Sequence, residues 1–186
     1  MADIFFIDIS SIPDRKNGKT HRRFSREVLS TILSEKYGIT SDISETNGKP
    51  YLKTSDMKFS ISHSENIIAI AFDKDFNLGF DIEYKRERDY SKILKYYGQD
   101  FDKVSQKEFY QAWTIYEAEY KLGELCKYKI SFEYKNYICS LACSDRWTDD
   151  ITIYELGIDE AEKVSSIAGR KLSEVAVLPD TRIRIK

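Results

Sequence analysis

Hydrophobic residues recur at helical spacing in two long segments of the chain. In the segment 22–37 the apolar positions are Phe24, Val28, Leu29, Ile32 and Leu33. This spacing predicts a helix that buries one face and ends at Gly38. A second helix is predicted over 105–123, because Ser105 and Glu108 have the spacing of a capping box. Its apolar stripe is expected to comprise Phe109, Trp113, Tyr116 and Tyr120.

Strand signals fill much of the remaining chain, as short runs rich in β-branched and aromatic residues. They lie at 3–9, 58–62, 67–72, 78–83, 130–134, 137–143, 151–156 and 175–178. The three runs between residues 58 and 83 follow one another closely, which favours a small antiparallel meander. A turn is predicted at 47–50, where glycine and proline occur together, and a short helix at 89–98. The predicted fold class is α+β.

Two stretches of the chain show a faint internal repeat. When residues 67–83 are placed beside 138–154, two apolar strands, a polar turn and a third strand align. A duplication and a chance match of alternating residues both explain this alignment. We therefore treat 1–186 as a single compact unit, with approximate halves at 1–88 and 89–186.

Composition and charge narrow the class of protein. Of the 186 residues, 41% are hydrophobic and 32% are charged, which favours a globular unit with one core. The 29 basic and 31 acidic residues nearly balance, which argues against a dedicated nucleic-acid binder. No apolar run approaches the roughly 20 residues of a membrane span, and the first residues lack a basic leader. We therefore expect no membrane segment and a cytoplasmic location.

The strongest chemical signal is the sequence GFDIE at 79–83. On a strand, Asp81 and Glu83 point to one face and Ile82 points to the other. Two adjacent carboxylates repel each other unless a cation lies between them, and their oxygens suit Mg²⁺. A solvated edge strand is the alternative interpretation of the same alternation.

Three further positions are candidates for phosphate chemistry. Glu117 and Lys121 lie four residues apart on a predicted helix and share a face. They form either an ordinary surface ion pair, or a third carboxylate for a metal with a cation for phosphate. His63, between two serines at a predicted strand end, is either structural or a donor to a phosphate. A nucleophilic serine is not indicated, because no Gly-x-Ser-x-Gly motif is present.

Four sequence blocks occur in a fixed order along the chain. They are GKPYL at 48–52, FSISHS at 59–64, GFDIE at 79–83 and WTIYEAEYK at 113–121, with His21 and Arg22 ahead of them. Together they resemble the motifs of the 4′-phosphopantetheinyl transferases, and the surfactin-synthetase-activating class is the closer match. Each block alone is a weak signal, whereas the ordered set is specific.

The resemblance implies a monomeric enzyme that transfers the phosphopantetheine arm of coenzyme A to a serine of an apo acyl or peptidyl carrier protein. The other product is 3′,5′-ADP. By this similarity Mg²⁺ is held by Asp81, Glu83 and Glu117, and Lys121 meets the diphosphate. The nucleotide is expected to contact Arg22, Lys49, Pro50, Ser62 and His63. The implied fold is pseudo-twofold, with two similar halves, each a small antiparallel sheet packed on a helix, and coenzyme A in the cleft between them.

Physical chemistry supports one of these roles independently. Attack of a serine hydroxyl on a phosphorus atom requires a base, and Glu117 on a rigid helix is our candidate. Tyr116, however, stands where the family has a lysine. The loss of that cation keeps a second function open, a module that binds coenzyme A or a carrier protein without turnover. The same carboxylates could also serve a metal-dependent phosphohydrolase that acts on a small phosphate ester.

Two other features resemble functional elements without deciding the function. Phe6–Ile9 is similar to the metal-binding strand of the smaller, trimeric acyl-carrier-protein synthases, but we interpret Asp8 as structural because the blocks at 48–52 and 59–64 favour the larger class. The basic run at 84–88, followed by Lys92 and Lys95, is either a solvated face or a docking surface for an acidic carrier protein.

Overall fold

Helices and strands alternate along the chain as an α+β fold. The computed structural model describes residues 2–11, 18–46, 48–87, 89–96, 104–145, 151–158, 164–171 and 177–178. The helices are α1 (Gly18–Tyr37), α2 (Ser91–Tyr96) and α3 (Gln106–Leu122). The strands are β1 (Asp3–Asp8), β2 (Ile43–Thr46), β3 (Lys49–Leu52), β4 (Lys58–Ser64), β5 (Ile67–Asp73), β6 (Leu78–Tyr84), β7 (Tyr128–Tyr134), β8 (Tyr137–Cys143), β9 (Thr152–Ile158), β10 (Val164–Lys171) and β11 (Val177–Leu178).

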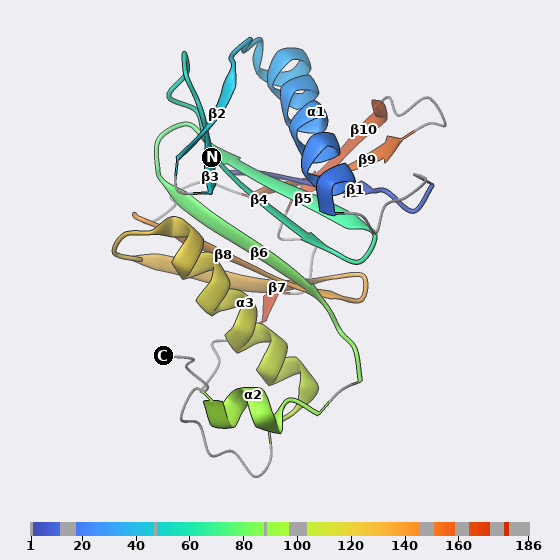
Figure 1. Ribbon diagram of the computed structural model, residues 1–186, viewed down its shortest axis with the longest axis vertical. Coiled ribbons are helices and arrows are strands. Elements are labelled where there is room, and N and C mark those ends of the chain that lie inside the picture. The colour runs from blue at the N-terminus through green and yellow to red at the C-terminus, as the bar shows by residue number, and fades with distance from the viewer. Residues whose placement is uncertain are drawn as a thin grey trace.

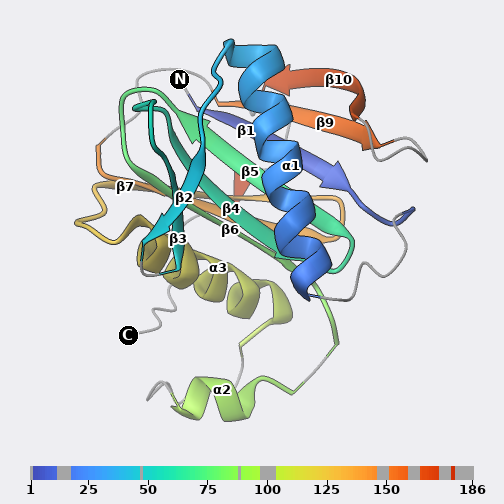
Figure 2. The same ribbon diagram turned by 45° about the horizontal axis from the view of Figure 1, so that its top comes forward.

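Two sheets lie face to face between α1 and α3 (Figures 1 and 2). The first has the strand order β10-β9-β1-β5-β4, and the second has the order β11-β7-β8-β6. β2 and β3 form a separate hairpin. Among the described residues, no helix has both the length and the apolar character that a membrane crossing requires.

The predicted three-strand meander is wrong in its last step. β4 and β5 pair as an antiparallel hairpin, but β6 pairs with β8, about 60 residues further along the chain. β6 therefore forms the edge of the second sheet, and β4 forms the edge of the first. β9 returns to the first sheet and pairs in parallel with β1. The two sheets are thus built from interleaved parts of the chain.

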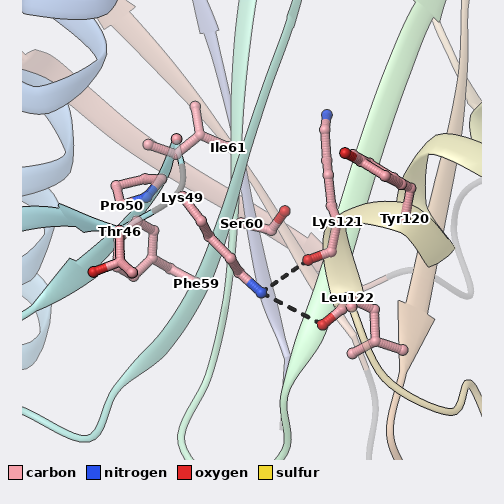
Figure 3. A pocket seen from close by; sticks show the side chains of 11 residues that line it. Thr46, Lys49, Pro50, Phe59, Ser60, Ile61, Tyr120, Lys121 and Leu122 are labelled. Atoms are coloured by element: carbon pink, nitrogen blue, oxygen red, sulfur yellow. Dashed lines mark hydrogen bonds between the residues drawn. The ribbon is translucent and has the colours of Figure 1, made fainter.

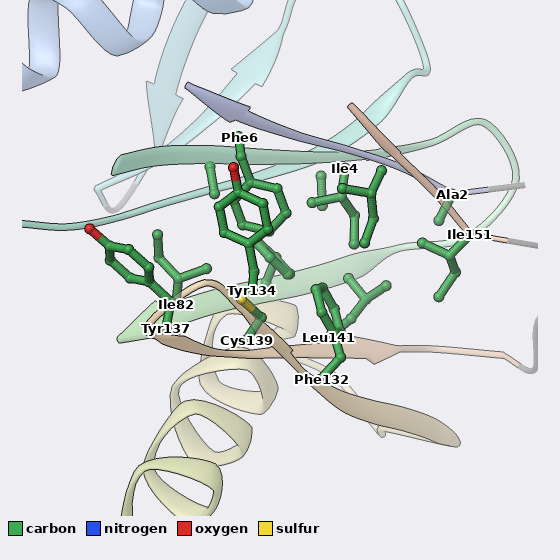
Figure 4. Close-up of a cluster of buried hydrophobic side chains, with 14 of the residues drawn as sticks. Ala2, Ile4, Phe6, Ile82, Phe132, Tyr134, Tyr137, Cys139, Leu141 and Ile151 are labelled. Atoms are coloured by element: carbon green, nitrogen blue, oxygen red, sulfur yellow. The ribbon is translucent and has the colours of Figure 1, made fainter. Parts of the chain in front are cut away.

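A hydrophobic core fills the space between the two sheets (Figure 4). β1 contributes Ile4 and Phe6, and the ring of Phe6 stacks on that of Tyr134 with 3.8 Å between their centroids. Phe80 and Phe132 approach Phe6 edge-on from the second sheet. Aromatic pairs in these two arrangements add to the stability that burial of their apolar area provides.

α1 covers the outer face of the first sheet. The residues of its predicted apolar face, Phe24, Val28, Leu29, Ile32 and Leu33, are all buried there. They pack against Phe5 and Ile7, which alternate with the core-facing residues of β1. The helix ends at Tyr37 as predicted, with Gly38 at φ +66°, but begins at Gly18, four residues before the predicted start.

α3 begins with the predicted capping box, in which Ser105 accepts from the amide of Glu108 and Glu108 accepts from that of Ser105. The predicted apolar stripe is wrong at its C-terminal end, because Tyr120 is 76% exposed. The buried residues of α3 that contact the second sheet include Phe109 of the predicted stripe. They also include a row at a spacing of four: Tyr110, Thr114, Ala118 and Leu122.

Gly79 of β6 explains why this face of α3 has small residues. A Cβ atom at this position would lie 2.0 Å from the carbonyl oxygen of Ala118 and 2.5 Å from the amide nitrogen of Leu122. Both atoms belong to the helix backbone and cannot rotate away. The glycine therefore lets α3 approach β6 closely enough for side chains of the two elements to share one site.

Candidate functional site

A ladder of serine side chains joins the edges of the two sheets. Ser60, Ser62 and Ser64 of β4 accept hydrogen bonds from the backbone amides of Phe80, Ile82 and Tyr84 of β6, at 3.0, 3.3 and 3.0 Å. These amides lie on the edge of β6 that has no strand partner among the described residues. The serine hydroxyls therefore satisfy backbone amides that a neighbouring strand would otherwise satisfy. They also bring the block at 59–64 beside the block at 79–83.

Asp81 is the centre of this junction. Its Oδ1 accepts a hydrogen bond of 2.7 Å from the hydroxyl of Ser62 and lies 2.6 Å from the ammonium of Lys121. The same ammonium donates to the carbonyl oxygen of Phe80 at 3.2 Å. The side chain of Asp81 is 8% exposed, and its Oδ2 is buried with no hydrogen-bond partner among the described residues. Three of the four sequence blocks thus meet at one carboxylate.

The other two acidic candidates lie around Asp81. Glu83, two residues further along β6, accepts a hydrogen bond of 3.0 Å from Ser64. Glu117 projects from α3, and burial raises the pKa of its carboxyl group. The charge of Asp81 raises that pKa further, whereas Lys121 lowers it. Glu117 and Asp81 are therefore close enough to repel each other.

The donor set fits a divalent cation only in part. In Asp81 it offers a buried carboxylate oxygen with no partner, and in Glu117 a second carboxylate that repels it. Oxygen donors of this kind suit Mg²⁺. Within the part of the chain that the structure describes, however, no three His, Cys, Asp or Glu side chains are grouped so that they could hold a metal ion as they stand. The ammonium of Lys121 lies on Asp81 instead.

A pocket of about 530 Å³ is lined in part by Lys121 (Figure 3). Its walls come from the β2–β3 hairpin, from β4 and from the C-terminal end of α3. Lys49 crosses it and donates hydrogen bonds to the carbonyl oxygens of Lys121 and Leu122, at 2.8 and 3.4 Å. A cation is favourable there, because the last carbonyls of a helix carry partial negative charge. Pro50, Phe59, Ile61 and Tyr120 supply apolar surface.

The remaining nucleotide candidates lie apart from this pocket. Ser62 is buried and bonded to Asp81, and His63 is exposed and does not line the pocket. Arg22 lines a separate hollow on α1, where it and Arg26 hold the carboxylate of Glu45 at 3.0 and 2.6 Å. The side chain of His21 lies outside the described residues. Of the predicted nucleotide residues, Lys49, Pro50 and Lys121 thus line the pocket, and Ser62 meets Lys121 at Asp81. Arg22 and His63 do not line the pocket.

Tyr116 packs against neighbouring side chains of α3. Its ring lies 6.2 Å from that of Trp113, and it contributes to a small apolar cluster around Ala112. The packing role expected for this substitution is thus present in the structure. The lysine that the resemblance leads one to expect here is replaced by an aromatic side chain, and Lys121 and Lys49 are the cations beside the pocket.

Much of the basic run at 84–88 is paired within the chain. Lys85 lies 3.3 Å from Glu133, and Arg86 forms an ion pair with Glu65. Lys107 also pairs with Glu133, and together these lysines hold the pKa of the Glu133 carboxyl below its usual value. Arg88 and the side chain of Lys95 lie outside the described residues. These pairs leave less free positive charge for docking than the sequence suggests.

Sequence reasoning missed the roles of several residues at the site. Ser60 and Ser64 are part of the ladder, and Phe59, Ile61 and Tyr120 line the pocket. One signal was available: serines at 60, 62 and 64 repeat at the period of a strand and therefore face one side. Nothing in the sequence indicated that this side meets β6.

Comparison with known proteins adds no independent assignment. No protein-family model matches the chain, and no curated protein matches it. A functional conclusion therefore depends on the chemistry of the site and on the order of the four blocks.

Proposed function

We propose that the protein is a Mg²⁺-dependent phosphopantetheinyl transferase that converts an apo acyl or peptidyl carrier protein to its holo form. One observation carries the proposal. Side chains from three separate blocks, Ser62, Asp81 and Lys121, meet at one buried carboxylate beside a pocket with two lysines. A cluster of ionisable side chains beside a pocket is a candidate active site.

The pocket has the chemistry of a site for the nucleotide half of coenzyme A. Phe59, Ile61 and Pro50 offer an apolar surface for a planar base, and Lys49 and Lys121 offer cations for phosphate. Its volume of about 530 Å³ is in the range of pockets that hold small ligands. A substrate that lies here brings its diphosphate to Lys121, next to Asp81 and Glu117.

The carboxylates supply the remaining chemistry. Asp81, Glu83 and Glu117 would hold Mg²⁺, which when bound neutralises charge on the diphosphate. The carrier serine oxygen forms a bond to the phosphorus of the phosphopantetheine arm. The bond from that phosphorus to 3′,5′-ADP breaks, and 3′,5′-ADP leaves with the electron pair. Glu117 takes the hydroxyl proton as the base.

The topology supports a pseudo-twofold fold. Helix α1 lies in the chain between β1 and the hairpin β4–β5, and α3 lies between β6 and the hairpin β7–β8. The strand orders β1-β5-β4 and β6-β8-β7 then correspond. Both hairpins turn at a non-glycine residue of positive φ, Glu65 at 50° and Lys135 at 52°. In this superposition Asp81 and Glu83 of β6 correspond to Phe5 and Ile7 of β1, so only one half would carry the acidic site.

Intact-mass measurement of a carrier protein tests the proposal. With coenzyme A and Mg²⁺, one of a panel of apo carrier proteins should gain the mass of one phosphopantetheine arm. Asp81→Asn should abolish the gain, whereas Asp145→Asn, which removes an exposed acid paired with Lys127, should not. No gain with any carrier contradicts the proposal. Coenzyme A binding without release of 3′,5′-ADP would then indicate a binding module, and release of nucleotide without a carrier would indicate a phosphohydrolase.

A further inference from the structure

Lys121 supplies the cation that pairs with the buried carboxylate of Asp81. Its ammonium lies 2.6 Å from Oδ1 of Asp81 and 3.2 Å from the carbonyl oxygen of Phe80. Its side chain is 29% exposed, so one end of the pair opens to the pocket while Asp81 itself is buried. A buried carboxylate requires such a partner, because a charge without a counter-ion is costly away from water.

We propose that Lys121 is the resident counter-cation of Asp81 in the metal-free protein, and that a divalent cation binds by displacing it. The inference rests on the proposed function, since it concerns the metal site of that reaction. It assigns Lys121 two successive partners: Asp81 before the metal arrives, and a phosphate in the pocket afterwards.

Electrostatics makes the two cations competitors. An ammonium and a divalent ion on the same carboxylate repel each other strongly at such short distance.

The surroundings permit the exchange without a change of fold. Ser62 holds Asp81 from the opposite element, β4, so the carboxylate keeps one partner when Lys121 leaves. Lys121 has a long flexible side chain, and it already lines the pocket where an anion would bind. Glu117, one turn earlier on α3, would be a second carboxylate for the metal.

Titration of Mn²⁺ into the protein without coenzyme A tests this competition. Lys121→Met removes the ammonium and keeps most of the length of the side chain. Its affinity for Mn²⁺, measured by calorimetry, should exceed that of the wild type by about tenfold or more, within the usual range of coupling between sites. Lys121→Arg retains the positive charge and should bind as weakly as the wild type.

Lys129→Met is the matched control for charge. Lys129 also pairs with an acid of α3, Glu119 at 2.7 Å, and its removal changes the net charge equally. Its Mn²⁺ affinity should stay within about twofold of the wild type, as expected for a screened charge that is not at the site. Circular dichroism and thermal melting show whether each variant is folded.

An unchanged or weaker affinity of folded Lys121→Met overturns the inference, since Lys121 then either does not compete or helps to build the metal site. An equal gain in Lys129→Met also overturns it, because the effect would then be one of net charge. The carrier-modification assay is separate. A wild type that modifies carriers while Lys121→Met gains no affinity refutes only the displacement, and a gain without carrier modification refutes only the transferase function.

Discussion

The hydroxyl of Ser62 donates a hydrogen bond of 2.7 Å to Oδ1 of Asp81 and accepts one of 3.3 Å from the amide of Ile82. One side chain therefore both connects the two sheets and orients the central carboxylate. Ser64, two residues further along β4, repeats this arrangement: it donates to Glu83 and accepts from the amide of Tyr84. The serines of the block at 59–64 are thus best understood as residues that position the acidic pair.

Ser62→Ala should weaken both the fold and the site. It leaves a buried amide and a buried carboxylate each without one partner, which costs about 1–3 kcal/mol in the free energy of unfolding. The rate constant for carrier modification should fall, while Ser62→Thr, which keeps the hydroxyl, should restore it. Urea denaturation and single-turnover kinetics measure the two effects.

Ser131→Ala is the control for stability alone. Ser131 bonds to Ser140 at 2.8 Å in a buried pair of hydroxyls and contacts no carboxylate of the site in any hydrogen bond that the described residues form. The Ser131→Ala variant should be less stable than the wild type but keep the rate constant of carrier modification. If it lost rate as severely as Ser62→Ala, the positioning role of Ser62 would be refuted.

Gly79→Ala should be among the most damaging substitutions in the chain. Its methyl group would overlap the backbone of α3 at Ala118 and Leu122, so the helix would have to move. We expect a loss of about 3 kcal/mol or more in the free energy of unfolding, at the upper end of the effects of overpacking. Gly38→Ala, whose added Cβ meets nothing within 4 Å but whose φ is +66°, should lose only about 1–2 kcal/mol. Equal losses would contradict the close approach of α3 to β6.

Glu117→Gln should stabilise the metal-free protein while it impairs the reaction. Burial and then Asp81 raise the pKa of Glu117, which means that the folded state disfavours its ionised form. This penalty is absent below the unfolded pKa and grows as pH rises through the pKa values of the unfolded and folded states. At pH 7.5 the amide should therefore shift the urea midpoint upward, and the rate of carrier modification should fall by about 100-fold or more, as for the loss of a general base. A lower midpoint would indicate that Lys121 dominates the environment of Glu117.

Alkaline pH should destabilise the protein through the buried Tyr137 and the partly buried Tyr37. Burial, then the hydrogen bond to Asp3, raises the pKa of Tyr37 far above its usual value, and burial raises that of Tyr137 to about 12. Both stay protonated in the folded chain when the unfolded chain has begun to ionise near pH 10. The contribution of these two tyrosines to stability should thus be constant below about pH 10 and fall as pH rises above that value. Tyr37→Phe should be less stable at pH 7 and show a shallower alkaline decline; an unchanged slope would contradict the assignment to Tyr37.

Local sequence signals predicted much of this fold. The capping box at Ser105 and the apolar spacing of α1 act within a few residues, so they were found from the sequence. The pairing of β6 with β8 was not predicted from the sequence. The hydrophobic pattern of β6 fits pairing with the strands that precede it in the chain equally well. The strands β2, β3 and β10 were missed, because Pro50 and the small and basic residues of 164–171 weaken their patterns.

The candidate site was predicted as residue types but not as an arrangement. Asp81, Glu83, Glu117 and Lys121 were identified from spacing and resemblance, and the structure brings Asp81 and Lys121 into contact. The exposed position of Tyr120 was missed, because small residues such as Ala118, rather than aromatic ones, allow α3 to pack closely on β6. The pairing of Arg22 with Glu45 depends on where β2 lies, which no local pattern specifies.

A crystal structure with coenzyme A and Mn²⁺ tests the central claim most directly, namely that Asp81 and Glu117 share one divalent cation. We predict a single anomalous peak within bonding distance of both carboxylates and of the diphosphate, with the Lys121 ammonium moved from Asp81 to a phosphate oxygen. A structure that contains bound coenzyme A but has no peak between Asp81 and Glu117, with Lys121 still on Asp81, would contradict the account.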